Sequence, residues 1–458
     1  MNLTIPEKYK SIIEKINSVA REINVDAFIV GGFVRDLLLK REPNDLDIMI
    51  APKTPSSLEK FCGINFAKTL SKKYVLPISV FEQFGTAKLN IENEEVEFIM
   101  PRKEIYDKNS RNPQTFPASL QEDAFRRDFT VNALFLKIDN LEIIDLTSNG
   151  LQDIENKLIR VTIAGDEQRI FCEDPLRILR AIRQSLQLDF QIESKTCEAM
   201  KFAANKIDIV SPDQIRDELN KILIVQNPSK AFLAMDSIGL LGKIFPELSK
   251  LKDIVQPKKY HNVDVFCHTL KVVDRVGNNL ILRMAALLCD IGKYETFNLK
   301  DKTITFYKHE IIGAKLAEIA LKRLNYQKDF CLKVAEIIKN HLYPKMYNDD
   351  WTDAAVRRFL QRCGDNLGLI LKISKADYGK DIGEEKLIKL ENRIEVLKNK
   401  NLLFPKEELL NGSELIEIFK KPAGKWIRFA KEKVNEMLIE NPTLTKEEII
   451  KSLKKSQN

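Results

Sequence analysis

The chain of 458 residues contains no apolar run long enough to span a membrane. Its first residues also lack the basic, then apolar, then small order of a signal peptide. Seven cysteines occur without CxxC spacing, which argues against a disulfide framework and a structural zinc knot. We therefore expect a soluble cytoplasmic protein with reduced thiols and no membrane association.

Internal repeats and low-complexity segments are also absent, and the length suggests three or more domains. The formal net charge is +7, which is the sign expected for a protein that binds a phosphate-bearing partner. Charge alone does not identify that partner, because many basic proteins bind no nucleic acid. The type of reaction and the partner have to be inferred from sequence motifs.

The most informative stretch is residues 28–50, FIVGGFVRDLLLKREPNDLDIMI. An apolar strand over 28–30 is followed by a glycine pair, Gly31 and Gly32, and then by apolar residues at helical spacing over 33–40. Glycines allow the backbone to approach a ligand, and the start of a helix offers free N–H groups to phosphate. The stretch predicts a strand, a turn suited to phosphate, and a helix that carries Arg35.

Two aspartates follow the helix. In a strand, Asp45 and Asp47 share one face, and Leu46 and Ile48 occupy the other. Paired carboxylates suit Mg²⁺, which can assist phosphoryl transfer when two ions lie about 4 Å apart. A glycine pair is common in turns, and two aspartates are common at the end of a strand. Together, the glycine turn and the paired aspartates predict a phosphate-binding turn beside a metal site.

The pattern GG-x-VRD, then eight residues, then D-x-D resembles the signature of the nucleotidyltransferase superfamily. It is most similar to class II tRNA nucleotidyltransferases, the CCA-adding enzymes, and to their relatives the bacterial poly(A) polymerases. The resemblance implies that Asp45 and Asp47 hold magnesium ions. It also implies a third carboxylate on a later strand, matched best by Glu97, with Glu95 as the alternative.

Residues 101–116 are polar and predict a loop, which resembles the flexible loop that helps CCA-adding enzymes change from C to A addition. Five residues fit that pattern: Arg102, Glu104, Tyr106, Arg111 and Pro113. A solvated connector would look the same.

The string RRDFTVNA, residues 126–133, predicts the start of a helical stretch with Asp128 and Asn132 on one face. It resembles a second family motif. We expect Arg127 to contact nucleotide phosphate or sugar, with Asp128 and Asn132 in support.

The string EDPLRILRAIR, residues 173–183, predicts a helix with Asp174 as its N-cap and Pro175 at its first position. Asp174 and Arg177 also provide an acceptor and a donor, which suit the amine and ring nitrogen that cytosine and adenine share. The string resembles the family's nucleotide-selecting motif EDxxR, which implies that role for Glu173, Asp174 and Arg177. We add Arg180 and Arg183, on the same helix, to the nucleotide-binding set.

The helix predicted at 211–223 matches a further family motif at Glu218 and Lys221 but departs from it at Asp213 and Gln214. We therefore assign this helix a scaffold role.

All four histidines lie between residues 261 and 341, and this region resembles an HD phosphohydrolase domain. Such domains bind a metal through a His, a His-Asp pair and a distant Asp. Here the pair reads Cys289-Asp290, with His268 and Asp377 as the other matches, and His261, His309 and His341 nearby. A thiolate favours softer metals than magnesium, so we expect a scaffold or substrate-binding role ahead of hydrolysis.

The predicted fold is an α+β head, with a small mixed sheet and helices, followed by all-α neck, body and tail domains. We place a nucleotidyltransferase head at 1–145, a helical nucleotide-selecting and RNA-binding neck at 146–255, an HD-like domain at 256–385 and a basic tRNA-binding tail at 386–458.

The predicted function is addition of CMP and AMP, from CTP and ATP, to the 3′ end of tRNA by two-metal catalysis with Mg²⁺. The alternatives with the same chemistry are an A-adding tRNA nucleotidyltransferase and a poly(A) polymerase. An HD phosphohydrolase is disfavoured by Cys289, and an inactive RNA-binding protein by the intact Asp45 and Asp47.

Overall fold

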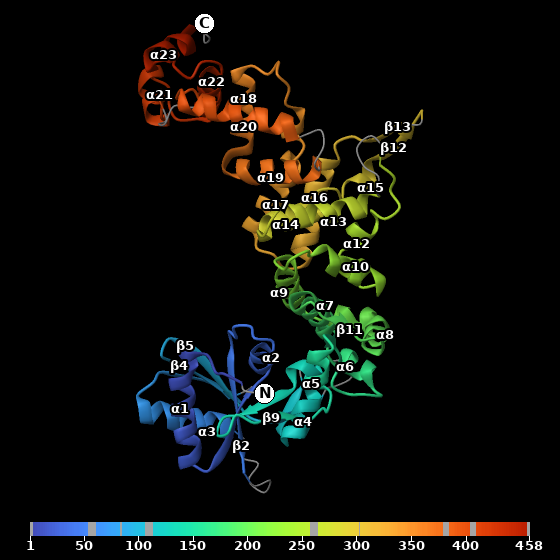
Figure 1. Ribbon diagram of the computed structural model, residues 1–458. Helices are drawn as coiled ribbons and strands as arrows, with labels where there is room; N and C mark the ends of the chain where they lie inside the picture. Colours follow the sequence, from blue (N-terminus) through green and yellow to red (C-terminus); the bar gives the residue numbers. More distant parts are fainter. Residues whose placement is uncertain are drawn as a thin grey trace. The chain divides into compact units, whose positions relative to one another are not determined.

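The chain folds into two compact units, Met1–Pro246 and Glu247–Asn458 (Figure 1). The computed structural model describes residues 3–53, 61–82, 85–105, 113–256, 264–301, 303–378, 384–403 and 409–455. A membrane-spanning helix is absent from these ranges. The first unit contains a mixed sheet and the second is mainly helical, so the predicted fold class is confirmed.

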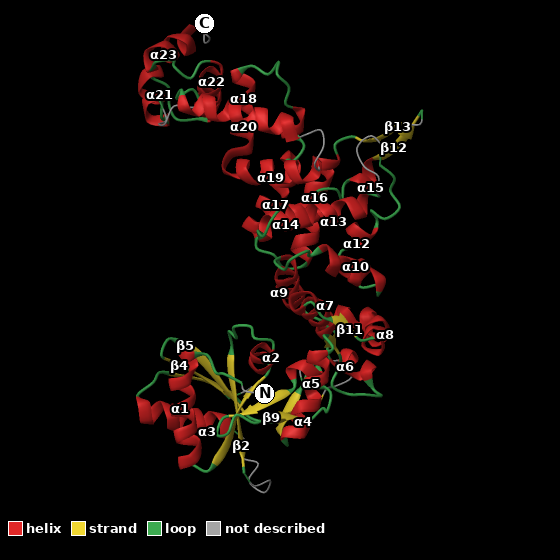
Figure 2. Ribbon diagram, in the orientation of Figure 1, coloured by secondary structure: helices red, strands yellow, loops and turns green. Residues whose placement is uncertain are grey.

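The first unit is built on a seven-stranded sheet with the order β3-β4-β5-β2-β1-β8-β9 (Figure 2). Only the pair β2 and β5 is parallel, and the other neighbours are antiparallel. The strands are β1 (Val25–Val30), β2 (Leu46–Pro52), β3 (Ile78–Phe81), β4 (Thr86–Ile91), β5 (Glu94–Ile99), β8 (Leu134–Lys137) and β9 (Ile143–Asp145).

Strand β2 lies in the interior of this sheet, and its residues alternate as predicted. Leu46 and Ile48 are almost fully buried, whereas Asp47 is partly exposed and Asp45, just before the strand, is exposed. In the pairing register Asp47 lies opposite Val30 of β1 and opposite Glu97 of β5. The sheet therefore places Asp47 of β2 next to Glu97 of β5.

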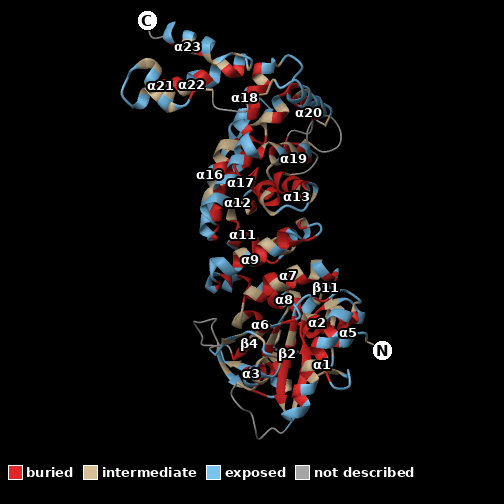
Figure 3. Cartoon of the chain, turned by 90° about the vertical axis from the view of Figure 1, so that its left-hand side faces the viewer, coloured by how far each residue is buried: buried red, intermediate tan, exposed pale blue. Residues whose placement is uncertain are grey.

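Helices pack on the sheet and position the turns between its strands. Helices α1 (Glu7–Glu22) and α3 (Cys62–Tyr74) pack against β1 and β2, which are largely buried (Figure 3). The Tyr9 hydroxyl of α1 donates to the carbonyl of Pro43 at 3.1 Å, and its ring packs edge-on against Phe33 of α2 (Gly32–Leu38). This contact holds the segment that leads into Asp45.

Helix α4 (Leu120–Arg126) packs on the sheet face toward which Asp47 points. Met49 and Ala51 share that face because side chains alternate along a strand, and both join a buried cluster with Ala124 of α4. Arg127, the residue after α4, lies with Asp47 beside Gly31.

The segment predicted as a loop over 101–116 is flanked by a hairpin of β6 (Arg102–Ile105) and β7 (Gln114–Pro117). The loop prediction was wrong for these flanks, because their backbone groups pair with one another. The predicted residues Tyr106 and Arg111 lie outside the described residues, as does His261.

The rest of the first unit is mostly helical, with one two-stranded parallel sheet. Its elements are η2 (Thr130–Asn132), α5 (Gly150–Glu155), β10 (Leu158–Ile159), α6 (Glu167–Glu173), α7 (Leu176–Leu188), β11 (Gln191–Ile192), α8 (Ser194–Ala203), η3 (Ala204–Ile209), α9 (Pro212–Leu223), α10 (Ser229–Ser237) and α11 (Leu241–Ile244).

The second unit is a succession of helices with one hairpin, β12 (Phe297–Lys300) and β13 (Thr303–Phe306). Helix α12 (Pro246–Ser249) begins it. Its other helices are α13 (Val265–Arg275), α14 (Leu280–Leu288), α15 (Lys293–Thr296), α16 (His309–Arg323), α17 (Lys328–Asn340), η4 (Tyr343–Met346), α18 (Asp353–Cys363), η5 (Gly364–Asn366), α19 (Leu367–Tyr378), α20 (Glu384–Asn399), α21 (Gly412–Phe419), α22 (Lys425–Glu440) and α23 (Lys446–Lys455).

Candidate active site

Three carboxylates gather at the start of β2 and the middle of β5. Asp47 and Glu97 are register partners, and Asp45 precedes Asp47 by two residues on the same side of the chain. Glu95 instead pairs with Asn90 and accepts a bond of 2.6 Å from Lys88, with two thirds of its side chain exposed. The register thus favours Glu97 over Glu95 as the third carboxylate.

The carboxylate of Asp47 lies in an environment that favours a bound cation. Burial, then the charge of Glu97, raise the pKa of Asp47 to about 6, and Asp45 adds to the rise while Arg127 opposes it. Like charges that raise one another's pKa are relieved by a divalent cation, for which carboxylate oxygens are preferred ligands. Asp47, Asp45 and Glu97 are therefore the candidate ligands of such a cation.

The glycine turn lies directly beside these carboxylates. Gly31 has φ +77°, a conformation that favours glycine, and a β-carbon there would lie 3.6 Å from Nη1 of Arg127 and 3.8 Å from Oδ2 of Asp47. The backbone of Gly31 and Gly32 thus borders the space between a guanidinium and a carboxylate. Such a space suits a phosphate that also contacts a metal ion.

The motif at 126–133 is not helical as predicted. Arg126 ends α4, Arg127 and Phe129 are extended, Phe129 forms a bridge with Val161, and only Thr130–Asn132 forms a 3-10 turn. The carboxylate of Asp128 accepts the N–H of Phe129 at 2.8 Å, which favours the turn over a continuing helix. The expected neighbours still meet, since Asn132 donates to Asp128 at 2.9 Å.

Arg127 is oriented by Asp123, a residue that the sequence interpretation missed. Asp123 is fully buried and accepts bonds of 2.9 Å from Nε and Nη2 of Arg127, as well as 2.7 to 2.9 Å bonds from Arg126. Burial alone would raise the pKa of Asp123, but the two arginines lower it below the usual value. The spacing of four residues between Asp123 and Arg127 is typical of an ion pair on a helix, and it could have indicated this contact from the sequence.

Asp128 connects this motif to helix α7. Its Oδ2 accepts from Nε and Nη2 of Arg180 at 3.0 and 2.7 Å, and its Oδ1 accepts from Asn132. Burial opposes ionisation, but Arg180 and then Asn132 lower the pKa of Asp128 to about 2. Asn132 also accepts from Arg35 at 2.7 Å and donates to Gln184 at 2.9 Å, so the network fixes residues of three predicted motifs.

The nucleotide-selecting motif lies where α6 ends and α7 begins. Helix α7 starts at Leu176, so its N-cap is Pro175 and the prediction of Asp174 as N-cap was wrong, although Oδ1 of Asp174 accepts the N–H of Leu176 at 3.2 Å. The other oxygen, Oδ2, lies 3.9 Å from Nε of Arg177. Asp174 thus uses one oxygen at the helix start and turns the other toward Arg177.

Arg177 is 8% exposed and donates from Nη2 to the carbonyl of Arg126 at 3.0 Å. Its Nη1 is buried and has no hydrogen-bond partner among the described residues. Glu104 of β6 lies 4.0 Å from Nη2. A buried guanidinium with an unused donor is suited to a ligand acceptor, because an unsatisfied buried donor is costly.

Arg183 is bound to α9. Its Nε donates to Glu218 at 2.6 Å, and Lys221 donates to the second oxygen of the same carboxylate at 3.1 Å. The scaffold role expected for this helix fits these contacts. Glu173, in contrast, pairs with Arg169 at 2.7 Å and lines a separate cavity that also includes Arg177.

Most of these residues line one cleft of about 760 Å³, where the described part of the chain contributes seven arginines and four acidic side chains. Asp45, Glu97 and Glu173 are not part of the lining. The predicted residues that line it are Gly31, Gly32, Arg35, Asp47, Arg127, Asp128, Asn132, Asp174, Arg177, Arg180 and Arg183. Residues 31 to 183 thus contribute to a single site suited to a polyanion.

Three family models match the chain in order. Residues 27–160 match the poly A polymerase head domain, residues 189–252 match the probable RNA and SrmB-binding site of polymerase A, and residues 259–395 match the HD domain. The head model covers the carboxylates and the glycine turn.

Similar curated proteins are A-adding and multifunctional enzymes. The A-adding tRNA nucleotidyltransferase of Aquifex aeolicus is 39% identical over 183 residues, which are 39% of this chain and 20% of that protein. The multifunctional CCA protein of Herminiimonas arsenicoxydans is 31% identical over 313 residues, 66% of this chain and 70% of that protein. Among the A-adding relatives, the match spans 20% to 60% of the relative's own length.

The fold also resembles solved structures. The CCA-adding enzyme of Bacillus stearothermophilus, crystallised with CTP, superposes with a TM-score of 0.69 at 22% identity, over 99% of this chain and 98% of that one. This likeness concerns the fold.

The raised pKa of Asp47 predicts how cation binding depends on pH. Because only the ionised carboxylate binds a cation, affinity should fall about tenfold per pH unit below about pH 6. Titration with Mn²⁺, followed by electron paramagnetic resonance, measures this dependence. Glu97→Gln removes a negative charge and should move the break to lower pH, whereas an unchanged break in that variant would contradict the assignment.

Proposed function

The chain belongs to the family of tRNA nucleotidyltransferases that contains the multifunctional CCA proteins, and we propose that it adds CMP and AMP to the 3′ end of tRNA from CTP and ATP. The observation that carries the proposal is the position of Asp174 and Arg177, which line the same cleft as Asp47. One site then combines a metal-binding carboxylate with groups that can select C and A. No nucleic-acid template is required.

Asp45, Asp47 and Glu97 are proposed to hold Mg²⁺. The raised pKa of Asp47 and its pairing with Glu97 fit a cation with a preference for oxygen ligands. When bound, two magnesium ions supply positive charge to the attacking 3′-hydroxyl of tRNA and to the leaving pyrophosphate. The sheet provides rigid ligands, since Asp47 and Glu97 come from neighbouring strands.

The arginines of the cleft bind and orient the triphosphate. Arg127 lies beside Gly31 and is fixed at Nε by the buried Asp123, so its Nη1 side faces the glycine turn. The guanidinium and the backbone near Gly31 together border the position for phosphate. Orientation of the α-phosphate for attack is a main source of rate in such transfers.

Asp174 and Arg177 select the base. The carboxylate accepts from the exocyclic amine of cytosine or adenine, and the free Nη1 of Arg177 donates to the adjacent ring nitrogen. Uracil and guanine present a carbonyl and an N–H in those places, so they would leave the buried groups unpaired. Selection by side chains explains how two nucleotides can be chosen at one catalytic centre.

We propose the same four regions as the sequence predicts. They are a catalytic head at 1–145, a nucleotide-selecting neck at 146–255, an HD-like domain at 256–385 and a tRNA-binding tail at 386–458. In the tail, α22 and α23 carry exposed lysines, including Lys433, Lys451, Lys454 and Lys455. Such side chains can contact the RNA backbone.

An A-adding activity alone is the second candidate. It is favoured by the A-adding relative from Aquifex aeolicus, which has the higher identity over its shorter match. A poly(A) polymerase shares the head domain model and the same chemistry.

The proposed activity is tested with tRNA lacking CCA, tRNA ending in CC, and an unrelated RNA, each with labelled CTP or ATP. We expect two CMP and then one AMP on the first substrate, and one AMP on the second. AMP on the second substrate alone would identify an A-adding enzyme. Long A tracts on the unrelated RNA would identify a poly(A) polymerase and overturn the proposal.

The carboxylate assignment predicts a contrast between neighbouring variants. Asp45→Ala and Glu97→Ala should lower incorporation of both nucleotides by on the order of 10²- to 10³-fold or more, because each removes charge from the metal site. Glu95→Ala is the matched control and should remain active, since its carboxylate pairs with Lys88. Single-turnover rates with CTP and ATP measure the effect. Full activity of Asp45→Ala would refute the metal assignment.

The selection role predicts that Arg177→Ala loses discrimination against UTP and GTP by about 10- to 100-fold, the loss expected for one charged hydrogen bond. Ratios of kcat/KM for the four nucleotides measure it. Arg169→Ala is the control, because Arg169 is more than half exposed and pairs with Glu173 outside the cleft. Wild-type selectivity in Arg177→Ala would refute the proposed role of Arg177 in base selection.

A further inference from the structure

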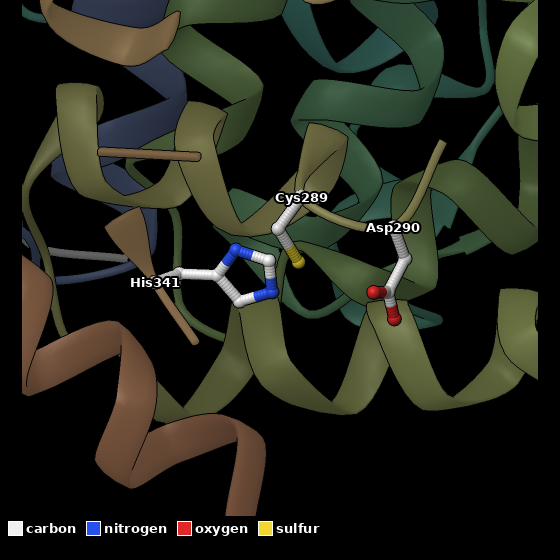
Figure 4. A group of neighbouring side chains, drawn as sticks. All are labelled: Cys289, Asp290 and His341. Carbon is white, nitrogen blue, oxygen red and sulfur yellow. The ribbon is translucent and has the colours of Figure 1, made fainter. Parts of the chain in front are cut away.

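A second group of chemically reactive side chains lies in the core of the second unit. Cys289 and Asp290 follow α14, His309 begins α16 and His341 follows α17. All four are at least nine-tenths buried. Figure 4 shows the sulfur of Cys289 between the imidazole of His341 and the carboxylate of Asp290, and the ligand atoms of these three residues lie within 4.8 Å of one another.

The two imidazoles present unused lone pairs. Nδ1 of His309 lies 2.9 Å from the carbonyl of Phe306, and Nδ1 of His341 lies 2.6 Å from the carbonyl of Ile338. Because a carbonyl accepts only from an N–H, Nδ1 carries the proton and Nε2 carries a lone pair. Both Nε2 atoms are buried without a hydrogen-bond partner in the described ranges. A cation would satisfy both of them.

Asp290 is oriented toward the same point. Its Oδ2 accepts from Lys293 at 2.9 Å, while Oδ1 lies 3.7 Å from Nε2 of His309. That distance is too long for a hydrogen bond but close to the roughly 3.3 Å that separates two ligands of a tetrahedral ion with bonds of about 2.0–2.1 Å.

Close backbone packing holds these ligands in place. A β-carbon on Gly292 would lie 2.2 Å from the carbonyl oxygen of His309 and 2.6 Å from the backbone nitrogen of Gly313. Only glycine permits this contact between the turn after Asp290 and helix α16. The separation of Asp290 and His309 is therefore set by the backbone.

A neighbouring group without sulfur, His268, Asp290 and Asp377, is already satisfied within the protein. Nε2 of His268 lies 2.6 Å from Oδ1 of Asp377, and Oδ2 of Asp377 accepts from Lys345. Its ligand atoms would have to give up these bonds to bind a metal. In the sulfur-containing group Sγ of Cys289 donates to the carbonyl of Ala286 at 3.2 Å, a bond that is lost when the thiol proton leaves, but the two imidazole nitrogens are unused.

An HD domain implies a metal, and the two unpartnered imidazole nitrogens fit one. We propose that Cys289, Asp290, His309 and His341 form a metal site with one thiolate ligand, which binds Zn²⁺ or Co²⁺ in preference to Mg²⁺. On binding, the S–H bond of Cys289 is replaced by a sulfur–metal bond and the proton passes to solvent. Sulfur and imidazole suit these ions, whereas Mg²⁺ requires oxygen ligands. The proposal is independent of nucleotide addition.

The test is titration of the metal-free full-length protein with Co²⁺. Wild type should develop a sulfur-to-cobalt charge-transfer band in the near ultraviolet, with one ion per chain in this site. Cobalt bound at Asp45 and Asp47 would give no such band, so the two sites are distinguishable. X-ray absorption of the zinc-loaded protein should show one sulfur at about 2.3 Å from the metal.

Cys289→Ser should lose the band and weaken Zn²⁺ binding by at least about tenfold, since even changes outside the ligand shell cost that much. Cys331→Ser, another buried cysteine in the same unit, is the matched control and should keep the band. A band that persists in Cys289→Ser, or a zinc spectrum without sulfur in wild type, would overturn the proposal. The wild-type spectrum decides the question even if Cys289→Ser does not fold.

Discussion

The pairing register of β2 between β1 and β5 is the constraint on which the proposed active site depends. Leu46 and Ile48 are buried on one face, so Asp47 must point to the other, next to Glu97. A slip by one residue would move Asp47 to the face that Leu46 and Ile48 occupy and bury its carboxylate, at a cost of several kcal/mol for the charge alone. The burial of Leu46 and Ile48, which stabilises the core, therefore also fixes the direction in which Asp47 points.

The basic side of the cleft depends on buried carboxylates that fix each arginine. Asp123 orients Arg127, Asp128 orients Arg180, and Glu218 orients Arg183. A guanidinium held in this way loses little conformational freedom when substrate binds, so its binding energy is available for positioning. Arg177 differs because its Nη1 remains available to a ligand.

Several elements could be predicted from local pattern alone. The strand, glycine turn and helix over residues 28–40 and the alternation around Asp47 follow from spacing, and both were confirmed. The helical interpretation of residues 126–133 was wrong, because it depended on a competition between helix and turn. The side chain of Asp128 and the bridge from Phe129 to Val161 decide that competition.

The sequence by itself determined the chemical groups, their order and the strand that carries the paired aspartates, because periodicity and residue type are local properties. Only the tertiary structure decided that Glu97 lies beside Asp47, that Asp123 holds Arg127, and that Gln184 joins Asn132. It also decided that Cys289 lies against His341, although 52 residues of chain separate them. Such contacts depend on strand register and helix packing, which no short stretch of sequence specifies.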